Sequence, residues 1–254
     1  MPPKARALSA AKRPALSIVV PAFNEERRLG PSLELLDAYA RRRRLAYEIL
    51  VVDDGSTDAT AALVRGMQKR LKGLGLLSLG LNRGKGAAVK AGVLAAKAPR
   101  ILFTDADLST PIEDLSVLEE ALDRGADLAV GSRALDRTRV SVHQPFYREA
   151  GGRLFNTLAQ GLSVPGIQDT QCGFKLFTAV LGRRVFRMQR VPRFGFDVEL
   201  LFLARKAGYR IAEVPVHWVN SPETKVRPFR DGGRAFLDLA MIRLYDWQGS
   251  YKGL

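Results

Sequence analysis

The chain is poor in the residue types that form disulfides and soft-metal sites. Among its 254 residues there is one cysteine, Cys172, and there are two histidines, His143 and His217. A single cysteine excludes an intrachain disulfide, and this favours a reducing compartment. The histidines are isolated and lack metal-ligand spacing. We therefore expect structural roles for both histidines and an inert, semi-buried thiol at Cys172.

The sequence also lacks long apolar runs. It contains no stretch of about 18 apolar residues, the length that a membrane-spanning helix requires. Residues 1–14 are basic and rich in proline and alanine, without the apolar segment of a signal peptide. We therefore expect a cytoplasmic protein that associates with membranes only peripherally.

Acidic residues are outnumbered by basic ones. The chain has 40 Lys and Arg against 26 Asp and Glu, a formal net charge of +14. A basic surface suits anionic lipid, phosphorylated substrates or nucleic acid, and solubility alone is the plain alternative. No RNA-binding or helix-turn-helix signature is present, so a nucleic-acid partner is not predicted. The oligomeric state stays open.

Short apolar segments alternate with helical patterns in the first half of the chain. This alternation predicts an α/β fold with a mostly parallel sheet sandwiched by helices. The predicted strands are residues 16–20, 48–52, 74–79, 100–104 and 128–131, and helices are predicted at 26–44, from 58, at 85–96 and at 111–122.

The second half of the chain is less regular. It predicts helices at 148–162, 196–206 and 233–247, and strands at 174–178 and 211–219. We expect a flexible basic tail over residues 1–14 and one domain over 15–254. Within that domain, residues 15–135 form a nucleotide-sugar half and 136–254 an acceptor half, by the resemblance described below.

Ligands of parallel sheets bind at the carboxyl ends of the strands, so the residues that follow each strand are informative. Asp105 and Asp107 follow one strand directly and could share a hard cation, Mg²⁺ or Mn²⁺, which usually also takes substrate phosphates. The alternative is that Asp107, Ser109 or Thr110 caps the helix that begins at Pro111.

Two further segments carry polar groups at strand ends. In Asp53–Asp58, an aspartate could accept from a base N–H or a ribose hydroxyl, or the segment could be only a turn and a helix cap. Asn82–Gly86 places Lys85 between two glycines at a helix start, as in an anion cradle. The alternative is a tight turn with a solvated lysine, and the Walker A pattern is absent.

These segments, with Val20–Glu25 before them and Val130–Arg133 after them, resemble in order and spacing the inverting family-2 glycosyltransferases of the GT-A fold. Beyond them, Asp169–Phe177 and Phe196–Leu201 resemble the dolichyl-phosphate β-glucosyltransferases. The polyprenyl-phosphate mannosyltransferases share the general pattern. The likeness runs from about residue 16 to about residue 245.

The resemblance implies a metal-dependent, inverting transfer of a hexose, with glucose favoured. The implied donor is a nucleotide diphosphate sugar such as UDP-glucose, and the implied acceptor is a polyprenyl phosphate, dolichyl or undecaprenyl. Mannosyltransferases often carry Gln two residues after the D-x-D motif, where this chain has Ser109, and this disfavours mannose.

The resemblance also assigns roles to residues. Pro21, Phe23 and Glu25 would border the base and ribose, Asp53 and Asp54 would hold the base edge, Asp105 and Asp107 would bind metal and diphosphate, Arg133 and Arg148 would hold the acceptor phosphate, and Lys225 would reach the diphosphate.

Two alternatives remain open. A sugar or protein hydroxyl as acceptor would need a general base, for which Asp197 or Glu199 could serve, but it would not need Arg133 and Arg148. The second alternative is a nucleotide-binding protein without catalysis.

Two surface features also have alternative explanations. The run Arg41–Arg44 falls near a helix end, where cations are favourable, although it could contact an anionic membrane. The helix at 233–247 is apolar around most of its girth. It could pack into the domain, pair with a second copy or lie in a bilayer interface.

Overall fold

The computed structural model describes residues 13–141, 146–219 and 228–254. Residues 1–12 of the predicted tail, His143 and Lys225 lie outside the described residues. Within the described part, no helix has the length and apolar character needed to cross a bilayer.

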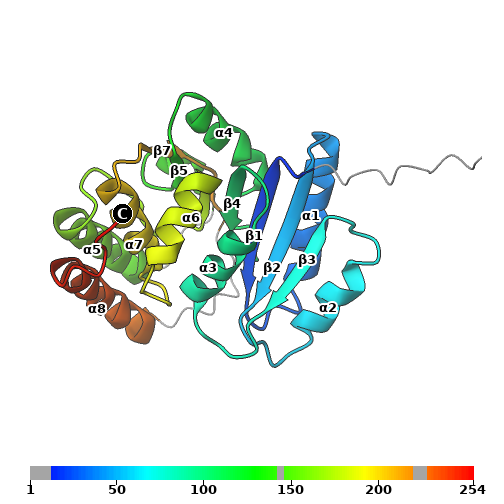
Figure 1. Cartoon of the computed structure of the whole chain (residues 1–254), viewed down its shortest axis with the longest axis horizontal. Coiled ribbons are helices and arrows are strands. Elements are labelled where there is room, and N and C mark those ends of the chain that lie inside the picture. The colour runs from blue at the N-terminus through cyan, green and yellow to red at the C-terminus, as the bar shows by residue number, and fades with distance from the viewer. Residues whose placement is uncertain (1–12, 142–145, 220–227) are drawn as a thin grey trace, which may run out of the picture.

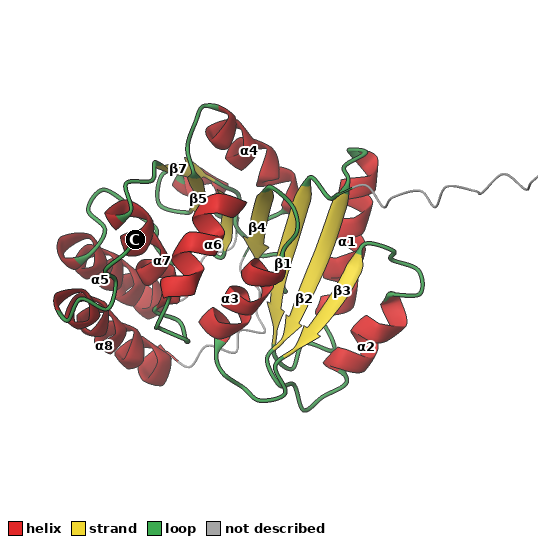
Figure 2. Cartoon of the chain, viewed as in Figure 1, coloured by secondary structure: helices red, strands yellow, loops and turns green. Residues whose placement is uncertain are grey.

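One seven-stranded sheet forms the centre of the molecule, in the order β3-β2-β1-β4-β6-β5-β7 (Figure 2). Every neighbouring pair is parallel except those of β6, which runs antiparallel to both β4 and β5. The predicted mostly parallel α/β sheet is therefore confirmed. The strands are β1 (Leu16–Ala22), β2 (Tyr47–Asp53), β3 (Leu74–Ser78), β4 (Arg100–Thr104), β5 (Leu128–Ser132), β6 (Phe174–Thr178) and β7 (Ile211–Pro215).

Helices cover both faces of the sheet and gather at one end of it (Figure 1). They are α1 (Leu29–Arg42), α2 (Thr60–Met67), α3 (Lys85–Ala95), α4 (Leu115–Asp123), α5 (Phe146–Leu162), α6 (Ala179–Met188), α7 (Phe196–Lys206) and α8 (Pro228–Trp247). Short 3₁₀ turns occur at Ile112–Asp114 and Arg137–Arg139.

Several elements differ from the sequence prediction: α8 begins at Pro228 rather than at residue 233, and α6 and β7 also differ. Helix α6 was not predicted, because its apolar residues alternate with arginines and with Gly182, which obscures the helical period. Thr178 caps it by accepting a hydrogen bond from the Leu181 N–H at 3.3 Å. Strand β7 ends at Pro215 rather than near residue 219, because its neighbour β5 ends at Ser132.

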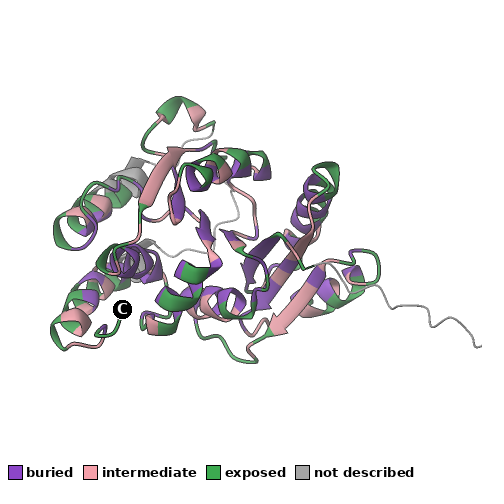
Figure 3. Cartoon of the chain, turned by 45° about the horizontal axis from the view of Figure 1, so that its top comes forward, coloured by how far each residue is buried: buried purple, intermediate pink, exposed green. Residues whose placement is uncertain are grey.

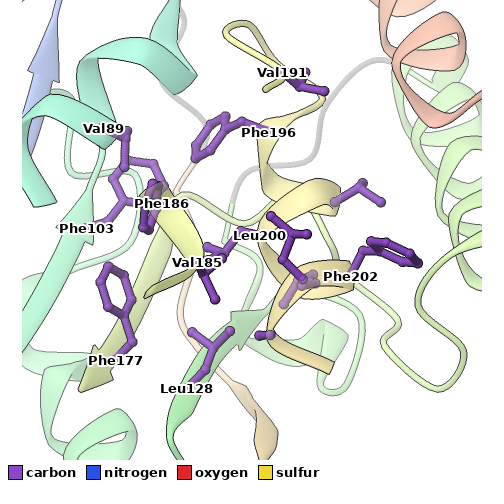
Figure 4. Packing of buried hydrophobic residues seen from close by; sticks show 14 of the residues in the cluster. Val89, Phe103, Leu128, Phe177, Val185, Phe186, Val191, Phe196, Leu200 and Phe202 are labelled. Carbon is purple, nitrogen blue, oxygen red and sulfur yellow. The ribbon is translucent and has the colours of Figure 1, made fainter. Parts of the chain in front are cut away.

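Strand alternation divides the apolar residues between two cores. In β1, Val19 faces the core beneath α3, α6 and α7, whereas Ile18 and Val20 face the core beneath α1 and α4. The first core is rich in aromatic rings, and Phe103 meets Phe196 of α7 edge to face at 5.7 Å (Figure 4). This contact fixes the start of α7 over the end of β4.

The arginine run at the end of α1 binds acids within the fold. Arg41 pairs with Asp37, Arg42 with Glu113 and Arg43 with Glu119. These pairs support the helix-end interpretation of the run.

Helix α3 approaches the sheet more closely than a side chain allows. A Cβ atom at Gly92 would lie 2.4 Å from a methyl carbon of Val19 and 2.9 Å from one of Val52. We expect Gly92→Ala to lower the free energy of unfolding by about 1–3 kcal/mol, the usual cost of overpacking a core. Urea unfolding followed by circular dichroism measures this.

The matched control is Gly66→Ala in α2, where an added Cβ would meet nothing within 4 Å. This change should stabilise the chain by about 0.5–1 kcal/mol, because alanine favours the helix. Equal effects of the two substitutions would contradict the close approach of α3 to the sheet.

Candidate functional site

The polar residues that follow β1, β2 and β4 meet at one edge of the sheet. Ala22 and Asp53 are register partners at the ends of β1 and β2, and β4 ends one residue before Asp105. Asp54 donates its backbone N–H to the carbonyl of Ala22 at 2.8 Å. Segments far apart in the sequence thus form one site.

The two aspartates at the end of β2, Asp53 within the strand and Asp54 directly after it, are buried and bonded within the fold. Asp53 accepts hydrogen bonds from the Ser56 N–H at 3.0 Å and the Ser78 hydroxyl at 3.1 Å. Asp54 accepts from the N–H groups of Arg83 and Gly84, both at 2.8 Å. Burial raises the pKa of Asp54, and these two N–H donors oppose the rise. Asp54 therefore positions the loop that leads to Lys85.

Arg28 links Glu25, which follows β1, to Asp107 of the D-x-D motif. Glu25 accepts from Arg28 at 2.7 Å and 2.8 Å, and the same guanidinium lies 3.5 Å from Asp107. Asp107 also accepts from the Ser109 N–H at 3.1 Å, so it takes part in the turn before α4 as well. Phe23 is exposed at this edge, whereas Pro21 is buried within β1.

Lys85 and Asp105 form the centre of the site. The Lys85 ammonium lies 2.6 Å from Asp105 Oδ1, and it lies over the ring of Phe103 at 5.3 Å. Burial alone would lower the pKa of Lys85, but the charges of Asp105 and Asp197 outweigh it and raise that pKa. Gly173 lies against the other oxygen, since a Cβ there would be 2.0 Å from Asp105 Oδ2. The absent side chain leaves the space that the carboxylate fills.

A buried ion pair lies beneath this centre. The ammonium of Lys175, on β6, contacts Asp197 at the start of α7 and donates to the Cys172 carbonyl at 2.6 Å. Both charged side chains are almost completely buried. Burial raises the pKa of Asp197, while the charges of Lys175 and Lys85 oppose the rise. The site therefore alternates cation and anion through two lysines and two aspartates.

Arg133, at the end of β5, is held by a buried acid. Its Nε and Nη2 donate to Asp169 at 2.6 Å and 2.8 Å, and its guanidinium lies 5.5 Å from the ring of Trp218. Burial lowers the pKa of Arg133, but the charge of Asp169 outweighs this and raises it. Glu213 in turn accepts from the Asp169 N–H at 2.7 Å. Arg133 is partly exposed, and two of its donors are bound to this acid.

The structure brings together most of the predicted site residues, but not all can be placed. Asp105, Lys85 and Asp197 share one cluster, Glu25 and Asp107 are joined through Arg28, and Arg133 is near enough to Asp105 for its charge to matter. Arg148 belongs to α5, but its side chain lies outside the described part, and so does Lys225.

The donor set at Asp105 and Asp107 fits a hard divalent cation that is shared with a substrate. Both carboxylates are partly exposed at the strand exit. In the described ranges, no group of three or more His, Cys, Asp or Glu side chains could hold a metal. Mg²⁺ and Mn²⁺ commonly take one or two carboxylates and complete their shell with phosphate oxygens and water.

Several residues with candidate chemistry have structural roles. Glu199 is fully buried and accepts from the N–H groups of Arg190 and Val191 and from the Tyr251 hydroxyl. His217 bonds to Asp114. Burial raises the pKa of the Cys172 thiol to about 11, so it remains protonated near neutral pH. Cys172 is buried rather than semi-buried as predicted, and its inertness and the structural role of His217 stay predictions.

Sequence reasoning missed three charged partners in the site: Arg28, Asp169 and Lys175. The signal for Lys175 was present, because a lysine inside the apolar strand Phe174–Thr178 requires a buried acid. Asp169 begins the segment Asp169–Phe177, whose resemblance to the dolichyl-phosphate β-glucosyltransferases does not indicate a partner for Arg133. Nothing in the local sequence of Arg28 indicates its contact with Asp107.

The family model described as glycosyl transferase family 2 matches residues 17–181. The dolichyl-phosphate beta-glucosyltransferase of Dictyostelium discoideum is 37% identical over 249 residues, which covers 93% of this chain and 76% of that protein. The protein of the same name from Drosophila melanogaster is 38% identical over 250 residues, with 93% and 77% covered.

A solved structure shows the same fold. Glucosyl-3-phosphoglycerate synthase from Mycobacterium tuberculosis, in complex with Mn²⁺, uridine diphosphate and glucosyl-3-phosphoglycerate, superposes with a TM-score of 0.66. The two chains are 18% identical, and the match covers 91% of this chain and 80% of that one.

The buried pair leads to a prediction about stability. We expect Lys175→Met to lower the free energy of unfolding by about 3–5 kcal/mol, because it leaves Asp197 buried without its partner. The pKa of Asp197 should then rise further above its unfolded value. A carboxyl group whose pKa is higher in the folded than in the unfolded state stabilises the fold below its unfolded pKa. This contribution is lost as pH rises through the folded pKa. The loss should therefore be larger near about pH 8 than near about pH 5.5 in urea unfolding.

The control is the double variant Lys175→Met with Asp197→Asn, which removes both charges. It should lose less stability than Lys175→Met alone, and its loss should depend less on pH. An equal loss at both pH values without recovery in the double variant would contradict a charge-based role for Lys175.

Proposed function

Because the chain belongs to glycosyl transferase family 2, we propose that it transfers glucose from UDP-glucose to a polyprenyl phosphate. The chain is a glycosyltransferase with the GT-A fold expected from its sequence. The proposed acceptor and sugar are supported by one observation: the chain is 37–38% identical to dolichyl-phosphate beta-glucosyltransferases over 93% of its length. Membership of this family argues against the alternative of a nucleotide-binding protein without catalysis.

We further propose a divalent cation, Mg²⁺ or Mn²⁺, held by Asp105 and Asp107 together with the donor diphosphate. The Mn²⁺ and uridine diphosphate in the mycobacterial structure support this assignment. The cation would neutralise charge that builds up on the departing diphosphate. Lys85 lies against Asp105 and can bring a second positive charge to the same oxygens.

The chemistry of the acceptor reduces what the protein must supply. A phosphate monoester has a second pKa of about 6, so a lipid phosphate is largely a dianion near neutral pH and is already nucleophilic. Its oxygen would form a bond to the anomeric carbon while the bond to the diphosphate oxygen breaks, and the nucleoside diphosphate leaves. In-line displacement of an α-linked donor would give a β-linked product. The residues of the site would chiefly position the two substrates.

The burial of the two candidate bases supports a phosphate acceptor over a hydroxyl acceptor. Asp197 is buried against Lys175, and Glu199 is enclosed by three hydrogen-bond donors. A general base must come within hydrogen-bond reach of the proton that it removes. Neither carboxylate is placed to meet an acceptor hydroxyl from solvent without a rearrangement.

Arg133 and Arg148 remain the proposed contacts of the acceptor phosphate. The pairing of Arg133 with Asp169 fixes the plane of the guanidinium, and its position near Asp105 suits an acceptor phosphate that approaches the donor. Peripheral association with a membrane, where the lipid acceptor resides, is part of the same proposal. The roles of Pro21, Phe23, Glu25, Asp53, Asp54 and Lys225 toward the nucleotide remain predictions.

The transfer assay tests the reaction and its metal together. Labelled UDP-glucose, UDP-GlcNAc and GDP-mannose are each incubated with undecaprenyl phosphate, and counts in the organic phase are measured. We expect counts with UDP-glucose, loss of counts with EDTA, and recovery with Mg²⁺ or Mn²⁺. Asp107→Asn should lower the rate by about a hundredfold or more, as loss of one electrostatic group typically does.

The control is Asp123→Asn, which changes an exposed aspartate on α4 that pairs with Arg100. Its rate should stay near that of the unaltered chain. Full turnover of Asp107→Asn in chelator would exclude the metal assignment, and transfer from GDP-mannose alone would exclude glucose.

Arg133→Lys tests the acceptor site. Lysine keeps the charge but loses the bidentate fork, so we expect the KM for polyprenyl phosphate to rise about ten- to a hundredfold, equivalent to about 1.5–3 kcal/mol. Donor affinity, measured by calorimetry with UDP-glucose and metal, should change little.

The pair with Asp169 calls for a second variant, because Arg133→Lys also weakens a structural contact. Asp169→Asn loosens the same contact but keeps the guanidinium. It should therefore lower the melting temperature while raising the acceptor KM less than Arg133→Lys does. Identical kinetic profiles of the two variants would show that Arg133 acts only by holding the loop.

A further inference from the structure

A buried tyrosine that follows α8 donates a hydrogen bond to a buried glutamate of α7. Helix α7 is buried over nearly its whole length, from Phe196 to Ala204 (Figure 3). The Tyr251 hydroxyl lies 2.6 Å from Glu199 Oε1, and both residues are almost completely buried. Burial raises the pKa of Tyr251, and the hydrogen bond to Glu199 adds to the rise. The phenol therefore stays protonated and acts as the donor of this bond.

Glu199 uses both of its carboxylate oxygens to hold the segment that precedes α7. We call this segment, residues 189–195, the α6–α7 loop. Oε1 accepts from the Arg190 N–H and Oε2 from the Val191 N–H, each at 2.8 Å. Burial raises the pKa of Glu199, and its three hydrogen-bond donors oppose the rise, the Tyr251 hydroxyl most strongly. The position of the loop therefore depends on the carboxylate that Tyr251 binds.

The α6–α7 loop lies against the segment that carries Lys85. The Pro192 carbonyl of the loop accepts a hydrogen bond from the Ala87 N–H at 3.0 Å. A Cβ atom at Gly84 would lie only 2.5 Å from the same carbonyl oxygen, so the two backbones meet without a side chain between them. Residues on both sides of Lys85 in the sequence therefore contact one carbonyl group of the loop.

Two further contacts hold the loop against α3. The Lys90 ammonium donates to the Gln189 carbonyl at 2.8 Å. A Cβ atom at Gly86 would lie 2.6 Å from the Cβ of Phe196, the residue that follows the loop. Packing this close leaves little free space, so a shift of the loop must be accompanied by a shift of the start of α3. Lys85, the first residue of α3, would move with it.

We propose that Tyr251 and Glu199 are positioning residues for Lys85 and thereby set the affinity of the site for the donor diphosphate. The contacts run from Tyr251 through Glu199 and the α6–α7 loop to the start of α3. Electrostatic stabilisation by a charged group depends on its exact placement, so a displaced ammonium binds the diphosphate oxygens less well. The inference rests on the proposed function for the role of Lys85 toward the diphosphate.

Tyr251→Phe tests the proposal, because it removes the hydroxyl and keeps the ring, which packs on Phe202. We expect the Kd for uridine diphosphate with Mn²⁺, measured by calorimetry, to rise about three- to tenfold, less than loss of a direct charged contact would cause. In the transfer assay, the KM for UDP-glucose should rise by the same factor. The KM for undecaprenyl phosphate should stay unchanged, since the acceptor site is not part of this path.

The matched control is Tyr47→Phe, which removes another phenol hydroxyl that donates to a carboxylate, that of Asp37. Tyr47 is the first residue of β2, whereas Asp53, at the other end of the strand, borders the site. The control should lower the melting temperature and leave the Kd for uridine diphosphate unchanged. A lowered melting temperature of Tyr251→Phe with an unchanged Kd would overturn the proposal, because both tyrosines would then be structural only.

A double-variant cycle with Lys85→Met shows whether Tyr251 acts through the lysine. Once the ammonium is absent, a shift of the start of α3 no longer displaces a charge. Adding Tyr251→Phe to Lys85→Met should therefore raise the Kd for uridine diphosphate by less than about twofold. An equal rise with and without the ammonium would contradict action through Lys85.

Hydrogen exchange at the start of α3 gives a readout that needs no ligand. The Ala87 N–H, which the Pro192 carbonyl accepts, should exchange about three- to tenfold faster in Tyr251→Phe than in the unaltered chain or in Tyr47→Phe. Unchanged exchange at Ala87 would overturn the proposal. If the unaltered chain binds uridine diphosphate but transfers no glucose, the proposed function fails, while the Kd and the exchange rate still decide the role of Tyr251. Absence of any binding would overturn both.

Discussion

The burial of one lysine sets the arrangement of the site. Lys175 lies on β6, opposite Phe103 of β4 and Val130 of β5, inside the aromatic core. An ammonium at this depth is tolerated only if an acid reaches it, and the acid is Asp197 in the first turn of α7. The positive end of the helix dipole favours an acid at that position too. The pair thus joins the antiparallel strand to α7 and brings the start of α7 to the carboxyl end of β4.

From this pair the charges continue outward in alternation. Asp197 acts on Lys85, and Lys85 contacts Asp105 at the edge of the sheet. Asp54 and Gly84 hold the Lys85 loop in place, and Gly173 leaves room for the Asp105 carboxylate. A donor that brings a diphosphate and a divalent cation together would add charges of both signs to a site that is already balanced.

The sequence predicts best the features that depend on local pattern. The strands, their exits and the order of the motifs follow from apolar runs and short polar segments, and the sheet edge brought Lys85, Asp105 and Asp107 close, as the parallel topology requires. The partners of these residues could not be predicted, because Arg28 with Asp107, Arg133 with Asp169 and Lys175 with Asp197 join positions far apart in the sequence. The antiparallel β6 was hidden for the same reason: strand direction depends on which neighbours pair, and no local pattern records it.

Helix α8 and the site share α7 as a common support. Asp238 of α8 accepts from the Gly195 N–H at the start of α7, two residues before Asp197, and Asp246 holds the other end of α7 through Lys206. Helix α8 therefore supports both ends of the helix that carries Asp197. The charge of Asp197 contributes to the raised pKa of Lys85, so α8 supports a helix that belongs to the centre of the site. Contacts at both ends of α7 thus help to keep Asp197 in a fixed relation to the two lysines of the site.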